Sequence, residues 1–328
     1  MLLWASCRPT VSEPIRLTGN AQGTYYSISY YDHQMRDFTP QVDSLLHAFD
    51  LTASLWVDSS EICRFNDATD SLVVSDMFAD LFQKSMAISR ETDGCFDCRI
   101  APLVKAYGFA RTNRRDLSQS AIDSLVALCH SRVWLDTLPN GLIVIHKENA
   151  GAMLDFNAIA QGYSVDLLCE MFGRRGVEHY LVDVGGEVRG KGHKNDGTLW
   201  KVGIERPALS KNDSRIVEVA IPLSDESVVT SGSYRKYYEK NGVRFSHTIN
   251  PFTGRPVAHT TLSTSVIDKE AWRADALATA FMVMGYKDAQ DWIRRNPQVK
   301  EAFFIYDDNG EYRHYATPDF QKRIDSMQ

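Results

Sequence analysis

The chain has 328 residues, of which 44% are hydrophobic, so it can bury one large core or two modest ones and is not a disordered or fibrous protein. Its formal net charge of -6 gives no general attraction for polyanions, so nucleic acid is not an expected partner. No run of the sequence approaches the roughly 18 apolar residues that a membrane-spanning helix needs.

The N-terminus resembles the end of a bacterial lipoprotein signal. Ala5 and Ser6 directly precede Cys7, and a polar stretch follows. We therefore interpret residues 1–20 as a signal remnant and tail, and expect an exported protein held by lipid at Cys7 on the periplasmic side of a bacterial membrane. An accidental cysteine near the terminus is the alternative.

Apolar periodicity then predicts strands and helices along the chain. Alternation indicates a strand at 23–31, and helical spacing indicates helices at 42–53 and 77–89. Two short apolar runs, 131–135 and 142–145, flank a Pro-Asn-Gly turn and indicate a hairpin. Further strands are expected at 180–184, 199–205, 216–222, 227–231, 262–267 and 302–306, and helices at 158–174 and 272–296.

Hairpins and widely spaced helices, without a regular βαβ series, predict an α+β fold with a mixed or mostly antiparallel sheet. Neither an internal repeat nor a low-complexity linker divides the sequence. We therefore assign residues 21–328 to one domain.

Cys95 and Cys98 have the spacing of a redox pair, but no histidine or second cysteine pair accompanies them to complete a zinc site. Cys129 and Cys169 follow apolar residues at helical spacing, as small buried side chains do. The cysteines therefore predict neither a disulfide framework nor a zinc centre.

Asp275 and Thr279 lie four residues apart at the start of an expected helix, so the carboxylate and the hydroxyl share one face. Two oxygen ligands with no neighbouring His or Cys suit a hard cation such as Mg²⁺. The alternative is a capping aspartate and a solvated threonine, which is the commoner origin of such a pair.

Three other clusters present polar groups from turns. Residues 246–256 are rich in Pro and Gly, and His247 among them could accept a proton near neutral pH. Gly185 and Gly186 end a strand where a ligand could approach the backbone closely. Residues 154–166 run from a strand into a helix whose first N–H groups could bind ligand or metal. An ordinary turn or cap is the alternative in each case.

Taken in order, these clusters resemble the ApbE family of flavin transferases from about Gly23 to Gly285. Several of the matching segments are common individually, but their order is specific. The segments are Gly23-Thr24-Tyr25-Tyr26, Ser60-Glu61-Ile62-Cys63-Arg64-Phe65-Asn66, Thr92-Asp93-Gly94-Cys95-Phe96-Asp97, Pro102-Leu103-Val104, Tyr107-Gly108-Phe109, Leu154-Asp155, Gly162-Tyr163, Gly185-Gly186, Thr230-Ser231-Gly232, His247, Pro251, Thr253-Gly254, Pro256, and Ala274-Asp275 with Thr279.

The resemblance implies an α+β fold likened to tunnelling-fold domains, and an enzyme that uses Mg²⁺ to transfer FMN from FAD to a threonine of an acceptor protein, releasing AMP. Asp275, Thr279 and the main-chain carbonyl of Ala158 would hold the metal. His247 would be the catalytic base beside the reacting phosphate. The residues implied at the FAD are Gln22, Trp56, Cys95, Phe96, Asp97, Asp155, Gln161 and Thr248.

Four positions depart from the family pattern. Gln22 stands where the family usually has Met, and Gln161 stands where it often has Lys. Without that lysine, one favourable contact to a phosphate or a flavin carbonyl is lost. Cys98-Arg99 also replaces the usual residues, and the sequence offers no interpretation of this change.

The resemblance also implies membrane redox subunits as acceptors, and a lipid at Cys7 would keep the enzyme near them. Hydrolysis of FAD to FMN and AMP is the nearest alternative, because the same metal and base can act on water as the nucleophile in place of the threonine. A flavin-binding lipoprotein without catalysis is an alternative from a different class.

Overall fold

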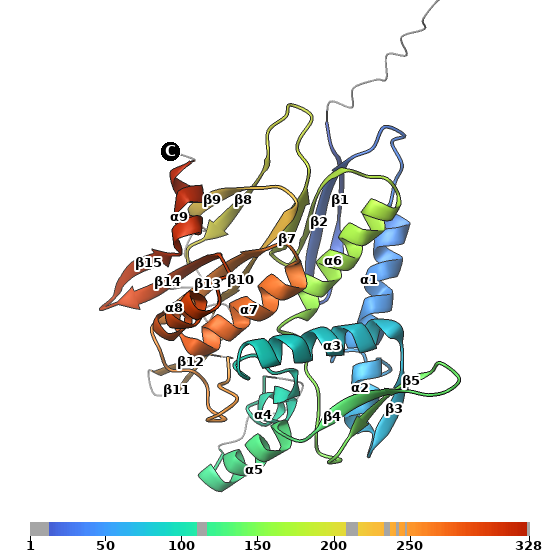
Figure 1. Cartoon of the computed structure of the whole chain (residues 1–328), viewed down its shortest axis with the longest axis vertical. Helices are drawn as coiled ribbons and strands as arrows, with labels where there is room; N and C mark the ends of the chain where they lie inside the picture. Colours follow the sequence, from blue (N-terminus) through green and yellow to red (C-terminus); the bar gives the residue numbers. More distant parts are fainter. Residues whose placement is uncertain are drawn as a thin grey trace, which may run out of the picture.

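An antiparallel sheet forms the centre of the molecule (Figure 1). The computed structural model describes residues 13–109, 117–207, 216–232, 237–240, 243–246 and 248–326. Within these residues the sheet has eight strands in the order β1-β2-β6-β7-β10-β13-β14-β15. Their bounds are β1 Ile15–Ala21, β2 Thr24–Tyr31, β6 His179–Val184, β7 Glu187–Lys191, β10 Glu226–Gly232, β13 Thr261–Asp268, β14 Glu301–Asp308 and β15 Glu311–Ala316.

β1 corrects the expected tail at 1–20, because residues 15–21 pair with β2 along their whole length. The alternation in β1 is weak: Leu17 is buried, whereas the polar Arg16 and Thr18 on either side are exposed. A single buried side chain gives little periodic signal in the sequence. The strand forms because β2, which buries Tyr26 and Ile28, offers it a free edge.

Four helices cover one face of the sheet and enclose the first hydrophobic core with it. Figure 1 shows α1 and α6 lying together over β1 and β2, with α7 over the middle of the sheet. Ile28, Val182 and Val229 point from the strands into this core, and Phe281 meets them from α7. The helices are α1 Thr39–Ala53, α6 Ala160–Arg174, α7 Ala271–Met284 and α8 Tyr286–Arg295.

The opposite face of the sheet carries a separate core, covered by the paired strands β8 (Trp200–Glu205) and β9 (Val217–Leu223) and by helix α9 (Pro318–Asp325). Adjacent side chains of β10 point to opposite faces of the sheet: Val228 packs in this core and Val229 packs in the first core. This is the alternation expected of a strand buried on both sides.

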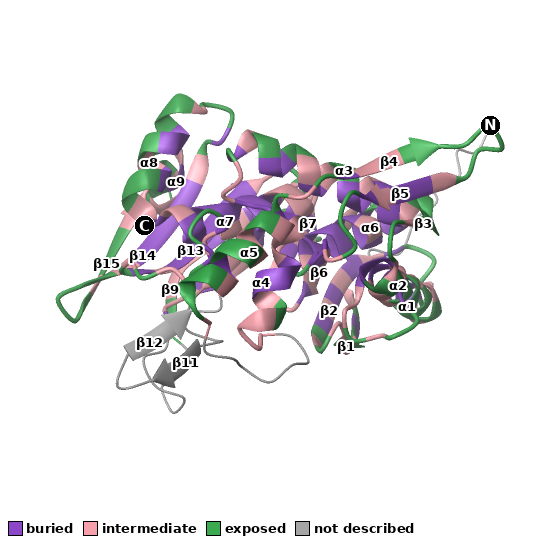
Figure 2. Cartoon of the chain, turned by 90° about the horizontal axis from the view of Figure 1, so that it is seen from below, coloured by how far each residue is buried: buried purple, intermediate pink, exposed green. Residues whose placement is uncertain are grey.

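A second core lies beside the sheet, between α7 and a small sheet in the order β3-β5-β4. The predicted hairpin is confirmed, because β4 and β5 pair antiparallel across the Pro-Asn-Gly turn. Figure 2 shows the buried residues of this region continuing into α6 and α7. The remaining elements are α2 Glu61–Asp67, β3 Ser71–Val74, α3 Asp76–Glu91, a 3-10 turn Cys98–Ile100, α4 Ala101–Ala106, α5 Gln119–Cys129, β4 Val133–Thr137, β5 Ile143–Lys147, β11 Tyr237–Lys240 and β12 Val243–Ser246.

The single helix expected at 272–296 is wrong, because Gly285 divides it into α7 and α8. Gly285 has a φ of 79°, in the left-handed region that ends helices. A Cβ atom there would lie 2.9 Å from Cδ2 of His259, so the break also depends on glycine's small size. α7 is apolar over most of its surface and α8 is amphipathic, and both patterns are compatible with one continuous helix in the sequence.

The predicted α+β class with a mostly antiparallel sheet is confirmed. No helix within the described residues has the length and apolar character needed to cross a bilayer. Cys7 and His247 lie outside the residues that the structure describes.

Candidate functional site

Helix α7 is placed by a carboxylate from α6. Asp166 accepts hydrogen bonds from the main-chain N–H groups of Ala271 (3.1 Å) and Trp272 (2.8 Å), which begin α7. Arg189 of β7 forms an ion pair with the same carboxylate. A negative side chain at a helix N-terminus accepts hydrogen bonds from the unpaired N–H groups and interacts favourably with the positive end of the helix dipole. Asp166 thereby fixes α7 against both α6 and the sheet.

Asp275 lies one turn further along α7 and is 5% exposed. Its Oδ2 accepts a hydrogen bond from the N–H of Gly162 at 3.0 Å. Burial raises the pKa of the Asp275 carboxyl to about 7, and the charge of Asp166 acts in the same direction. A buried carboxylate without a cation nearby is costly, so a bound cation would be strongly favoured here.

The Gly162 contact caps the start of α6. Gly162 is the third residue of this helix, so its N–H has no acceptor within the helix, and the Asp275 carboxylate supplies one. Only glycine permits this approach, because a Cβ atom on residue 162 would lie 2.3 Å from the carbonyl oxygen of Ala271. The carbonyl of Ala158, just before the helix, accepts no hydrogen bond among the described residues.

Thr279 follows Asp275 by one turn and presents a third oxygen on the same face of α7. Its Oγ1 lies 3.2 Å from Oγ of Ser231, near the end of β10. Asp275 and Thr279 thus present a carboxylate and a hydroxyl on one face of α7, and Ala158 lies just before the first turn of α6, which Asp275 contacts through Gly162. Within the described residues no group of three His, Cys, Asp or Glu side chains could hold a metal, so a cation here would need these mixed oxygen donors.

The turn at Gly185 and Gly186 lies next to the first turn of α6. Gly185 has a φ of 66°, and a Cβ atom there would lie 2.4 Å from Nε2 of Gln161 and 2.7 Å from Cγ2 of Thr24. The space next to this glycine is therefore occupied by the Gln161 amide and the Thr24 methyl group, and the approach of a ligand to this turn stays a prediction. Gln161 immediately precedes Gly162, so the turn lies beside the first turn of α6.

Arg99, one of the residues that depart from the family pattern, contacts Asp97. Asp97 accepts hydrogen bonds from Nε of Arg99 at 2.9 Å and from a terminal nitrogen of Arg99 at 2.7 Å. Arg99 thus neutralises Asp97 in a forked ion pair. The N–H of Asp155 donates to the carbonyl of Cys98 at 2.7 Å, so the predicted FAD segments at 95–97 and 155 lie together.

Each of the five cysteines in the described residues is a free thiol. Burial raises the pKa of Cys95 to about 11, and burial raises the pKa of Cys98 well above its ordinary value. Both groups therefore stay protonated at neutral pH, which disfavours a redox or zinc-binding thiolate.

The other residues predicted at the FAD occupy different surroundings. Phe96 is 2% exposed within the second core, and its N–H donates to Oγ1 of Thr92 at 3.1 Å, so its ring is not exposed for stacking on a ligand. Trp56 is 57% exposed in the loop after α1, where its ring can cover a ligand at the surface. Thr248 is half-buried, and its carbonyl accepts a hydrogen bond from Val257. These residues remain predicted FAD contacts.

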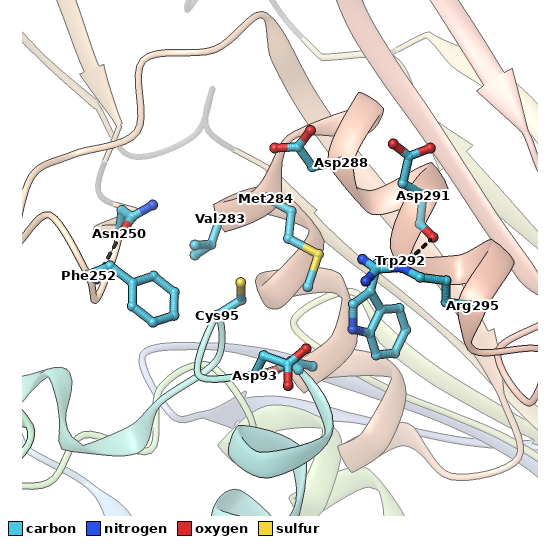
Figure 3. Close-up of a pocket in the computed structure, with 11 residues that line it drawn as sticks. Asp93, Cys95, Asn250, Phe252, Val283, Met284, Asp288, Asp291, Trp292 and Arg295 are labelled. Carbon is cyan, nitrogen blue, oxygen red and sulfur yellow. Dashed lines mark hydrogen bonds between the residues drawn. The ribbon is translucent and has the colours of Figure 1, made fainter.

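A cavity of about 390 Å³ opens one helical turn beyond Thr279 (Figure 3). Val283 and Met284 of α7 form its wall, and Figure 3 shows Cys95 and Phe252 converging on them from two other segments. Asp93, Asp288 and Asp291 also line it. Three carboxylates beside one arginine, Arg295, make this cavity unsuited to phosphate.

Sequence reasoning missed Asp166 and Arg189 as supports of the site, because oppositely charged residues on different elements leave no spacing signal. Ser231 belongs to a segment that matches the family, but its contact with Thr279 depends on β10 lying next to α7. The glycine at 162 was the one available signal, since a glycine in the first turn of an expected helix indicates a close approach.

A family model described as the ApbE family matches residues 22–304. The chain is 31% identical over 332 aligned positions to an FAD:protein FMN transferase of Vibrio cholerae, covering 98% of this chain and 96% of the relative. It is 30% identical to the FAD:protein FMN transferase of Escherichia coli K12, covering 93% and 88%. Among solved structures, the flavin transferase ApbE of Vibrio cholerae superimposes with a TM-score of 0.81 at 29% identity, covering 95% of this chain and 99% of the other. The apo flavinyl transferase ApbE of Pseudomonas stutzeri gives 0.82 at 30% identity, covering 95% and 97%.

Proposed function

Because this chain belongs to the ApbE family, we propose that it is an FAD:protein FMN transferase that uses Mg²⁺ and a threonine of an acceptor protein. The relatives share almost the full length of the chain, so the activity named for them concerns the same domain. The proposed metal ligands belong to the region where the start of α6 contacts α7.

The observation that carries the metal assignment is the buried carboxylate of Asp275, which accepts a hydrogen bond from the N–H of Gly162 and has no ion pair among the described residues. Asp275, Thr279 and Ala158 then supply three oxygen donors, the chemistry that Mg²⁺ prefers. When bound, Mg²⁺ neutralises charge on the pyrophosphate and on the leaving AMP.

The proposed reaction is a displacement at the phosphorus of the FMN half of FAD. The hydroxyl oxygen of the acceptor threonine forms the new P–O bond, the pyrophosphate P–O bond breaks, and AMP leaves with that electron pair. The threonine proton passes to a base, the role proposed for His247. Asp155, Gln161 and the segment 95–97 are proposed to orient the FAD, together with Gln22, Trp56 and Thr248.

We further propose an exported enzyme with lipid at Cys7, which would keep it beside membrane redox subunits as acceptors. The support is the Ala5-Ser6-Cys7 sequence alone. Metabolic labelling with a fatty acid would test it: label on the wild type and none on Cys7→Ser is expected, and equal label on both would refute the anchor.

The function itself is tested by incubating the full chain with FAD, Mg²⁺ and a candidate acceptor domain. Transfer predicts covalent flavin fluorescence on the acceptor and one AMP released per flavin attached. AMP and free FMN without labelled acceptor would instead indicate a pyrophosphatase. Intact FAD bound equally well after chelation would indicate a non-catalytic flavin-binding protein.

A further inference from the structure

A lysine side chain is buried beside the second core. Lys147, the last residue of β5, is 4% exposed, and its Nζ lies 4.9 Å from the centre of the Phe65 ring. Burial lowers the pKa of the Lys147 ammonium group, and Asp67 acts on it electrostatically without forming an ion pair. A buried ammonium group without an ion pair costs free energy, so its hydrogen bonds show what this cost maintains.

The ammonium group donates to two main-chain carbonyls from distant parts of the chain. Its Nζ lies 3.2 Å from the carbonyl oxygen of Asn66, near the end of α2, and 3.1 Å from that of Ala152. The Asn66 side chain holds the same stretch, because Nδ2 donates to the Leu154 carbonyl at 2.9 Å and Oδ1 accepts from the Leu154 N–H at 2.7 Å. Lys147 and Asn66 together fasten residues 152–154 to α2.

This stretch belongs to the irregular connection 148–159 between β5 and α6, where no helix or strand fixes the path of the chain. Asp155 follows directly and is 7% exposed. Its N–H donates to the Cys98 carbonyl at 2.7 Å, and its Oδ1 accepts from the N–H of Asn157 at 2.8 Å. The direction of the Asp155 carboxylate therefore depends on how the preceding main chain is held.

We propose that Lys147 is a positioning residue, which holds residues 152–154 and so fixes the Asp155 carboxylate in the orientation that receives FAD. The proposal rests on the proposed function, in which Asp155 orients FAD. Lys147 acts through the main chain, since it is too deeply buried to meet a ligand itself. An ammonium group can donate to two carbonyls at once, which an apolar side chain of the same length cannot do.

The first test compares initial rates of FMN transfer by the full-length wild type and by Lys147→Met, which keeps the length of the side chain and removes the donors. We expect the KM for FAD to rise about tenfold, because hydrogen bonds from a charged group are lost. The KM for the acceptor should stay that of the wild type. An unchanged KM for FAD would overturn the proposal.

A double-mutant cycle with Asp155→Ala tests whether Lys147 acts through Asp155. We expect Lys147→Met to raise the KM for FAD in the wild-type background and to add little once Asp155 is replaced. Equal increases in the two backgrounds would show that Lys147 affects FAD by another route, and would overturn the proposal.

Ile145→Ala is the matched control for lost stability. Ile145 lies two residues before Lys147 on the same strand and is fully buried in the second core. We expect Ile145→Ala to melt at a lower temperature than the wild type and to keep the wild-type KM for FAD. An increase in this KM as large as that of Lys147→Met would show that general loosening of the core is sufficient, and would overturn the positioning role.

Hydrogen exchange on the ligand-free proteins tests the proposal without turnover. The amides of Leu154 and Asp155 should exchange faster in Lys147→Met than in the wild type, and unchanged exchange would overturn the proposal. If Lys147→Met does not fold, Asn66→Asp, which removes only the Nδ2 donor to Leu154, should show the same two effects. A wild type that transfers no FMN would instead overturn the proposed function.

Discussion

The side chain of Asp275 has opposing effects on stability and on metal binding. Its carboxyl is buried, and its pKa is raised to about 7, so the folded protein without metal keeps a proton that the unfolded chain loses near its ordinary value of 3.8. The stabilisation from this group is complete below pH 3.8 and is lost as the pH rises toward 7. A bound cation would favour the ionised form and offset that loss.

We therefore expect the stabilisation of the protein by Mg²⁺ to increase with pH. At pH 5 protons compete with the metal for the Asp275 carboxylate, so about 5 mM Mg²⁺ should barely change the melting temperature. At pH 8 the same addition should raise it by several degrees. Thermal melts across this range check the expectation, with Ca²⁺ as a comparison ion. A shift in melting temperature that is independent of pH would argue against Asp275 as a ligand.

Substitution of the same residue separates the two effects. Asp275→Asn can still accept the Gly162 hydrogen bond but carries no charge, so FMN transfer should fall about 100-fold or more. At pH 8 the metal-free variant should melt at a higher temperature than the metal-free wild type, because no buried charge has to be maintained. Transfer assays and melts on the two proteins measure both quantities. A variant with normal transfer would remove Asp275 from the metal site.

The contact between α6 and α7 is the element on which the proposed metal site depends. In Gly162→Ala the new Cβ atom would meet the Ala271 carbonyl at 2.3 Å, which would push the two helices apart. We expect a loss of about 1–3 kcal/mol in the free energy of unfolding, together with weaker Mg²⁺ binding. Denaturant unfolding and Mg²⁺ titration measure these two effects.

Gly173→Ala is the matched control, since it lies on the same helix and a Cβ atom there meets nothing within 4 Å. Alanine has the better helix propensity, so this variant should be more stable by about 0.5–1 kcal/mol and should bind Mg²⁺ normally. If both variants behaved alike, the tight α6–α7 contact would not be what positions the site.

On the scale of the whole molecule, the three largest cores of the described residues support different parts of the structure. α7 separates the first two: Leu277 and Phe281 face the first core, and Ala276 and Ala280 face the second. The third core lies across the sheet, where Phe320 of α9 stacks on Phe303 with ring centroids 5.2 Å apart. The proposed site is thus attached to the first two cores and not to the third.

We expect Phe320→Ala to destabilise the protein by about 3–5 kcal/mol, because it empties a fully buried aromatic position. The affinity of the folded fraction for FAD should remain that of the wild type. Chemical denaturation gives the first quantity, and FAD titration under conditions where the variant is folded gives the second. A large change in FAD affinity would show that the two faces of the sheet are coupled.

The sequence by itself determined the class of fold and the residue types of the site. The alternating and helical periods of apolar residues show which side chains of one strand or helix share a buried face. For this reason β2, α3 and the β4–β5 hairpin could be predicted. The spacing of Asp275 and Thr279 fixed their shared helix face, because i and i+4 are adjacent on any α-helix. The order of short motifs gave the family.

Only the tertiary structure decided what these residues contact. The Gly162 hydrogen bond to Asp275, the support of α7 by Asp166 and the Ser231 contact with Thr279 join residues more than 40 positions apart. Such contacts have no period, since they depend on how α6, α7 and the sheet pack. The same packing divided the expected helix 272–296 at Gly285 and left the amide of Gln22 without a described partner, because both depend on neighbours that are distant in the sequence.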